Sequence, residues 1–164
     1  MKKIMVCLFF VFTNFTLSLN AQILWDKAEY GMTLERVKEL YPKALTVTKE
    51  NSADDGSKEL LNIKEIKISK DSFNVGFFFK DNKLTRVYFL PNAKLNDKTG
   101  DRVFKTLVEY LIGIYGQPDS TNTENVSIMI TKSAKWKSDG INIFLSSMII
   151  GKNNTIYLLY YKEQ

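Results

Sequence analysis

The chain is predicted to fold as an α+β domain in which two helices pack on one antiparallel sheet. Apolar residues recur at helical spacing in two separate segments, one following Thr33 and one beginning at about Asp101. Between and after these segments, apolar and polar residues alternate as in half-buried strands. This order of helix and then strands occurs twice, which predicts two similar halves that share one sheet.

The segment Met1–Ala21 has the pattern of a secretory signal peptide. Lys2 and Lys3 precede an apolar run, and the small residue Ala21 stands before Gln22. Polar residues inside the run are unfavourable in a membrane span. We therefore expect a single exported domain over residues 22–164, either periplasmic or secreted, with no transmembrane span in its mature form.

The first half is expected to begin with a short helix. Thr33 can accept a hydrogen bond from a free amide at its start, and Pro42 cannot continue it beyond Tyr41. A short strand should follow and lead into a polar, flexible hairpin loop over Lys49–Lys58. In the next strand the alternation slips by one place at Lys64-Glu65, which predicts a β-bulge.

Tight turns and a second helix organise the remainder of the chain. Asp81-Asn82 predicts a two-residue turn between two strands rich in aromatic residues. A longer helix is expected from about Asp101 until Gly116. A strand pattern then runs over residues 126–136, Asp139-Gly140 predicts another tight hairpin turn, and two further alternating runs complete the sheet.

Composition excludes several classes of catalytic site. The chain has no histidine, and its one cysteine, Cys7, lies in the apolar leader. Catalytic triads with histidine, thiol nucleophiles, zinc sites of the usual ligand types and redox dithiols are thereby excluded. The sequence also lacks the oxygen-ligand spacing of a calcium loop and a glycine-rich phosphate loop. We therefore expect no catalytic residues, no metal and no cofactor.

The positive charge of the chain is spread over its length. The formal net charge is +5, and acids directly follow lysines, as in Lys58-Glu59 and Lys80-Asp81. Only Lys132, Lys135 and Lys137 come close together, whereas proteins that bind nucleic acids cluster their basic residues on one face. We expect no nucleic-acid partner.

Aromatic residues in the predicted strands carry the main functional prediction. If Phe77 and Phe89 face the helices, the opposite sheet face receives several rings and one arginine. The predicted contact residues are Phe78, Arg86, Tyr88, Phe144, Tyr157 and Tyr161. Such a combination is typical of interaction surfaces, so we expect a non-catalytic domain that binds another envelope or extracellular protein. In the alternative interpretation, sheet curvature, the loop after Lys49 or a second copy of the chain covers these rings.

Two other functions stay open at this point. A carrier of a small molecule or lipid would need an apolar pocket between helix and sheet. A carboxylate hydrolase would need two acidic side chains that face each other across a cleft. Its candidates, Asp54-Asp55, Asp119 and Glu124, lie in or near predicted turns rather than in apolar runs that would raise a carboxyl pKa.

Two short motifs resemble a known group of proteins. The segments Gly31–Val37 and Tyr115–Pro118, with strands between them, resemble small exported bacterial domains of the β-lactamase-inhibitor-protein and SmpA/OmlA group. The resemblance implies binding of other proteins at the sheet surface, or a part in envelope assembly. SmpA/OmlA-type members resemble lipoproteins with a cysteine at the cleavage point, whereas this chain has Ala21-Gln22, so a lipid anchor is not implied.

Overall fold

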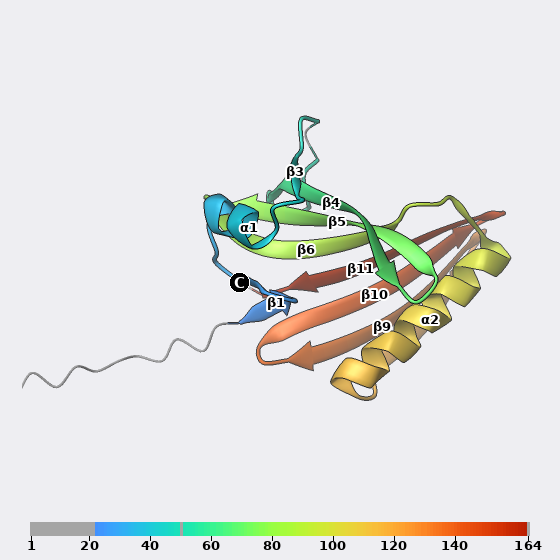
Figure 1. Cartoon of the computed structure of the whole chain (residues 1–164). Helices are drawn as coiled ribbons and strands as arrows, with labels where there is room; N and C mark the ends of the chain where they lie inside the picture. Colours follow the sequence, from blue (N-terminus) through green and yellow to red (C-terminus); the bar gives the residue numbers. More distant parts are fainter. Residues whose placement is uncertain (1–21, 50, 164) are drawn as a thin grey trace, which may run out of the picture.

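The computed structural model describes residues 22–49 and 51–163 (Figure 1). The predicted signal peptide lies outside these residues. The helices are α1 (Leu34–Leu40) and α2 (Asp97–Tyr115). The strands are β1 (Ile23–Trp25), β2 (Ala28–Glu29), β3 (Leu45–Thr46), β4 (Lys58–Ile68), β5 (Asp71–Lys80), β6 (Lys83–Pro91), β7 (Leu95–Asn96), β8 (Ser120–Val126), β9 (Met129–Ser138), β10 (Ile141–Ile150) and β11 (Asn153–Tyr161).

One large antiparallel sheet dominates the fold. Its strands follow the order β3-β4-β5-β6-β11-β10-β9-β8, with β7 paired to β11 beside this path. Helix α1 precedes strands β3–β6, and helix α2 precedes strands β8–β11. The last strands of these two sets, β6 and β11, pair with each other at the centre of the sheet. Both helices lie on the same face of the sheet (Figure 1). The predicted α+β class is confirmed, and the order of helix and then strands recurs as expected.

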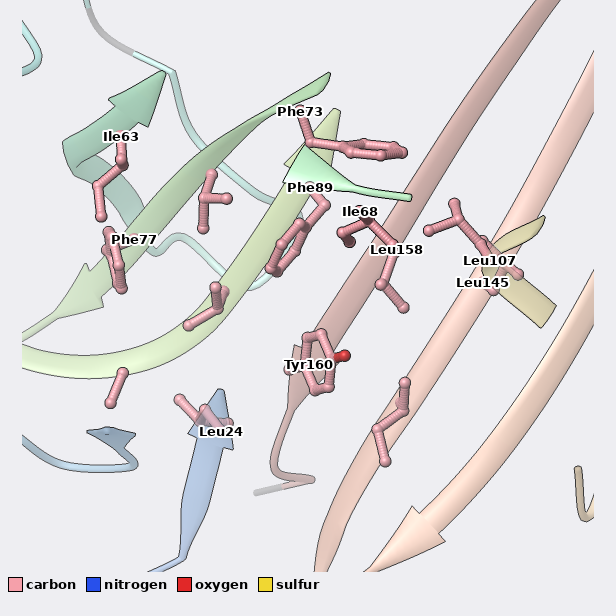
Figure 2. Packing of buried hydrophobic residues seen from close by; sticks show 14 of the residues in the cluster. Leu24, Ile63, Ile68, Phe73, Phe77, Phe89, Leu107, Leu145, Leu158 and Tyr160 are labelled. Carbon is pink, nitrogen blue, oxygen red and sulfur yellow. The ribbon is translucent and has the colours of Figure 1, made fainter. Parts of the chain in front are cut away.

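The hydrophobic core fills the space between the helices and the sheet. Figure 2 shows side chains of β4, β5, β6, β10, β11 and α2 meeting in this layer. The strand residues that alternation assigns to this face are all buried. They are Phe73, Phe77, Phe79, Val87, Phe89, Ile143, Leu145, Ile156 and Leu158. Trp25 closes the layer near α1, with its ring centroid 5.8 Å from that of Tyr41 and 5.1 Å from that of Phe89.

Local signals in the sequence set several boundaries correctly. The Thr33 hydroxyl accepts a hydrogen bond from the Arg36 amide at the start of α1. The predicted bulge in β4 is present, because the register shifts between Ile63 and Ile66 and Glu65 has a φ of 63°. Both predicted two-residue turns also form, with positive φ at Asp81-Asn82 and at Asp139-Gly140.

Two boundaries differ from the prediction. Helix α2 begins at Asp97 rather than near Asp101, because Asn96 and Thr99 form a capping box that starts the helix one turn earlier. The continuous strand expected over residues 126–136 is wrong: the chain reverses between β8 and β9, where Ser127 has a φ of 54°. All residues of β8 are exposed, so this edge strand has no buried face and no apolar alternation to reveal it.

Of the two described helices, neither combines the length and apolar character needed to cross a membrane.

Candidate functional site

The sheet face opposite the helices carries a hollow of about 630 Å³. Strands β4, β5, β6, β10 and β11 form its floor, and the loop between β3 and β4 forms one wall. We call it the outer hollow. Its lining includes all six predicted contact residues, which come from four different strands: Phe78, Arg86, Tyr88, Phe144, Tyr157 and Tyr161.

Four of these side chains form a continuous row of rings across the sheet, which we call the ring ladder. It runs from Phe78 in β5 through Tyr88 and Tyr157 to Phe144 in β10. The successive centroid distances are 5.8, 5.4 and 5.8 Å, within the range of favourable aromatic pairs. Lys135 of β9 extends the row, with its Nζ 5.4 Å from the Phe144 centroid.

The rings of the ladder differ in exposure. Phe78 is 5% exposed and therefore forms the buried end, whereas Tyr88, Tyr157 and Phe144 remain partly exposed. Burial raises the pKa of Tyr88 to about 12, with the neighbouring Tyr157 adding to the shift. Tyr88 is thus neutral at physiological pH and its hydroxyl can donate a hydrogen bond.

Arg86 is already engaged by the protein's own loop. Its Nε donates to Asp55 Oδ2 at 2.9 Å, and its Nη1 donates to Asp54 Oδ1 at 2.6 Å. Lys80 Nζ donates to the Asp55 carbonyl at 3.0 Å. Two carboxylates of the β3–β4 loop therefore already accept hydrogen bonds from the Nε and Nη1 atoms of Arg86. The loop after Lys49 thus contacts Arg86, whereas Tyr88, Tyr157 and Phe144 remain partly exposed.

Asp55 is the central residue of this loop contact. Its Oδ1 accepts hydrogen bonds from the Ser57 hydroxyl at 2.6 Å and from the Ser57 amide at 3.0 Å. Burial acts to raise the pKa of Asp55, but the Ser57 hydrogen bonds and the Arg86 charge outweigh it and hold the pKa below its ordinary value. The carboxylate is therefore ionised at neutral pH and fixes the loop against β6.

A polar wall adjoins the buried end of the ring ladder. The Glu59 carboxylate accepts hydrogen bonds from the side-chain amides of Asn51 and Asn62, both at 2.7 Å. Asn74 of β5 also lines the hollow, and its side-chain oxygen is buried without a hydrogen-bond partner among the described residues. The sequence prediction missed this wall. Asn74 and Gly76 precede Phe78 at every second position of β5, so the three positions lie on the same sheet face. This alternation could have indicated the polar wall.

The acidic side chains considered for hydrolysis make separate local contacts. Asp119 Oδ2 accepts from the Lys137 amide at 2.7 Å, and Glu124 Oε1 accepts from the Asn122 side chain at 2.7 Å. Asp54 and Asp55 are paired with Arg86. Within residues 22–49 and 51–163, no group of three or more acidic or cysteine side chains is arranged to hold a metal ion.

Two hollows formed by the described residues lie on the helix side of the sheet, where a carrier would need its pocket. The larger, of about 800 Å³, lies between Tyr115 at the end of α2 and strands β1 and β10, with the polar residues Gln22, Ser138 and Asp139 among its lining residues. The smaller, of about 290 Å³, lies between α2 and the strands β8 and β9, with Lys105 and Glu109 among its lining residues. Ligand pockets usually occupy about 300–1,000 Å³, a range that includes the outer hollow. The larger hollow beside α2 falls in the same range, and the outer hollow is the one that contains the predicted contact residues.

No protein-family model matches the chain, and neither the curated proteins nor the solved structures provide a significant match.

Proposed function

We propose that this chain is an exported, non-catalytic binding domain that contacts another envelope or extracellular protein through the ring ladder. One observation carries the proposal: four rings from four neighbouring strands touch in sequence on the sheet face opposite α1 and α2. The core on the other face is complete without them. A sheet face that met only water would be expected to carry polar residues at these positions.

The chemistry of the ladder suits contact with a protein. Tyrosine supplies a large rigid apolar surface and a polar tip, and such residues dominate the binding energy of many interfaces. Tyr88 and Tyr157 lie at the centre of the ladder and keep partial exposure. The leader pattern of the first 21 residues supports export, and the resemblance to exported domains that bind proteins at a sheet surface supports the same mode of use.

Site-specific photocrosslinking tests the proposal. A benzoylphenylalanine replaces Tyr157 in one variant and Tyr110, an exposed tyrosine on α2, in the control. Cells of the source organism that express each variant are irradiated, and adducts are identified by mass spectrometry. We expect a repeatable protein adduct from position 157 that is not obtained from position 110. Identical adducts from both positions, or none from 157, would refute use of the ladder.

Substitution of Tyr88 by alanine in the position-157 crosslinking variant provides the second arm. Because Tyr88 stacks on the crosslinking position at 5.4 Å between ring centroids, its loss should reduce adduct yield strongly. Tyr88→Ala removes two aromatic pairs, with Phe78 and Tyr157, each contributing about 0.5–1.5 kcal/mol beyond the lost burial, so circular dichroism of the variant is compared with that of the parent first. An unchanged adduct yield from a folded variant would contradict the proposal.

A further inference from the structure

The Glu59 carboxylate lies where the polar wall meets the ring ladder. A Cβ atom built on Gly76 would stand 2.7 Å from Glu59 Oε1 and 3.2 Å from the Phe78 ring. Gly76 therefore leaves room for the carboxylate directly over β5, beside the first ring of the ladder. The Cα partner of Gly76 in β6 is Tyr88, so the second ring also rises next to this point.

The charge balance of the outer hollow is negative at this end. Asp54 and Glu59 line this end and Asp55 lies beside it in the same loop, so three carboxylates face two cations, Arg86 on Asp54 and Asp55 and Lys80 on the Asp55 carbonyl. Glu59 takes part in none of the ion pairs formed among the described residues and is held only by the neutral amides of Asn51 and Asn62. Each of its oxygens accepts one such bond and retains capacity for another. An anionic group would be repelled here, and a cation would be attracted.

Hydrogen-bonding capacity points to the same kind of group. The buried Asn74 oxygen has no donor among the described residues, and an unsatisfied buried acceptor costs about 1–3 kcal/mol. Asn74 and Gly76 are two residues apart on one strand, which places the free oxygen roughly 7 Å along β5 from the carboxylate site. The occupant that fits therefore has several donors and a flat or apolar part to lie against the rings.

We infer that the outer hollow receives an arginine side chain of the partner protein. Its guanidinium donates to the Glu59 carboxylate and the Asn74 oxygen while its plane lies against the Tyr88 ring. Arginine fits better than lysine because its planar fork supplies five donors and stacks on aromatic faces. A guanidinium beside a carboxylate and a ring gains both a charge-assisted hydrogen bond and a cation–π contact. This inference rests on the proposed function and specifies what the ladder recognises.

Nuclear magnetic resonance titration with a minimal probe tests the inference. The full mature chain is titrated with N-acetyl-arginine methylamide, and separately with the citrulline analogue, which has the same shape and no charge. We expect saturable shifts at Gly76 and Tyr88 with the arginine probe, and binding at least about tenfold weaker with citrulline. Equal binding of the two probes, or no shifts with arginine, would overturn the inference without requiring any variant.

A pair of glutamate variants assigns the charge. Glu59→Gln should weaken binding of the arginine probe about tenfold, because the charge is lost while the remaining oxygen still accepts from one of the two neighbouring asparagine amides. Glu124→Gln is the matched control, since Glu124 is also a strand glutamate that accepts from an asparagine side chain at 2.7 Å, but outside the hollow. It should bind the probe as the parent does. Equal affinities of the two folded variants would refute a role for Glu59.

The crosslinking experiment separates failure of this inference from failure of the proposed function. If the arginine probe does not bind but position 157 still gives an adduct that depends on Tyr88, the protein partner stands and only its arginine contact is wrong. If adducts are absent as well, the proposed function fails together with the inference.

Discussion

Replacement of Asp55 by alanine should destabilise the protein far more than replacement of its neighbour Asp54. Both residues pair with Arg86, but the Asp54 side chain is 86% exposed and that of Asp55 only 21%. Asp55 also accepts two hydrogen bonds from Ser57, which is fully buried. Without Asp55, the buried Ser57 donors and one side of the guanidinium lose their acceptor, whereas removal of Asp54 breaks a single solvated ion pair.

The magnitudes follow from these contacts. A buried donor left unsatisfied costs about 1–3 kcal/mol, so loss of both Ser57 bonds and the Arg86 bond should cost about 2–4 kcal/mol in Asp55→Ala. An exposed ion pair contributes about 0–1 kcal/mol, which sets the expected cost of Asp54→Ala. Urea unfolding followed by tryptophan fluorescence measures both values, and a stability of about 5–15 kcal/mol leaves both variants folded at the outset.

The result that would refute this reasoning is an equal loss of stability in the two variants. It would mean that the exposed pair fixes the β3–β4 loop as firmly as the buried contacts do. Hydrogen exchange of the Ser57 amide gives an independent readout, because that amide donates to Asp55 and should exchange faster only in Asp55→Ala.

Two further predictions concern stability. In α2, Gly100→Ala should destabilise the domain by about 1–3 kcal/mol, because the new Cβ would meet the Asn154 side chain. Gly113→Ala places its Cβ more than 4 Å from other atoms and should stabilise the domain by up to about 1 kcal/mol. Thermal unfolding that gives both changes the same sign would contradict this prediction. The hydrogen bonds from Arg102 hold the pKa of Asp71 below its ordinary value, so its contribution to stability is present above about pH 4 and is lost as the pH falls further. Urea midpoints should therefore decrease as the pH is lowered below about 4, and should decrease less in Asp71→Asn.

The features of the fold that depend on residues within a single helix, strand or turn were predictable from the sequence. Alternation in β5 and β6 separates core residues from outer residues because successive strand side chains point to opposite faces. The Thr33 cap and the turn Asp139-Gly140 involve only residues close together in the chain, so neighbouring residues suffice to recognise them. Strand β8 escaped prediction because its position at the sheet edge leaves all its residues exposed, and polar residues then occupy both faces.

The candidate site was predictable only in part. Period-two alternation placed Phe78, Tyr88 and Tyr157 on one face, but it could not say that they touch, because their contacts depend on which strands are neighbours. The pairing of β6 with β11 brings together residues about seventy positions apart in the chain. The same limit applies to Arg86, whose partners Asp54 and Asp55 reach it only when the β3–β4 loop folds over the sheet.

The sequence by itself determined the α+β class, the two tight turns and the division of side chains between a core face and a ring-bearing outer face. These properties depend on spacing along the chain and on the chemistry of single residues. The tertiary structure alone decided that the rings form a continuous ladder, that Arg86 is neutralised by its own loop and that Glu59 lies over Gly76. Each of these depends on distances between segments remote in sequence, and such distances are fixed only when strand order and register are established.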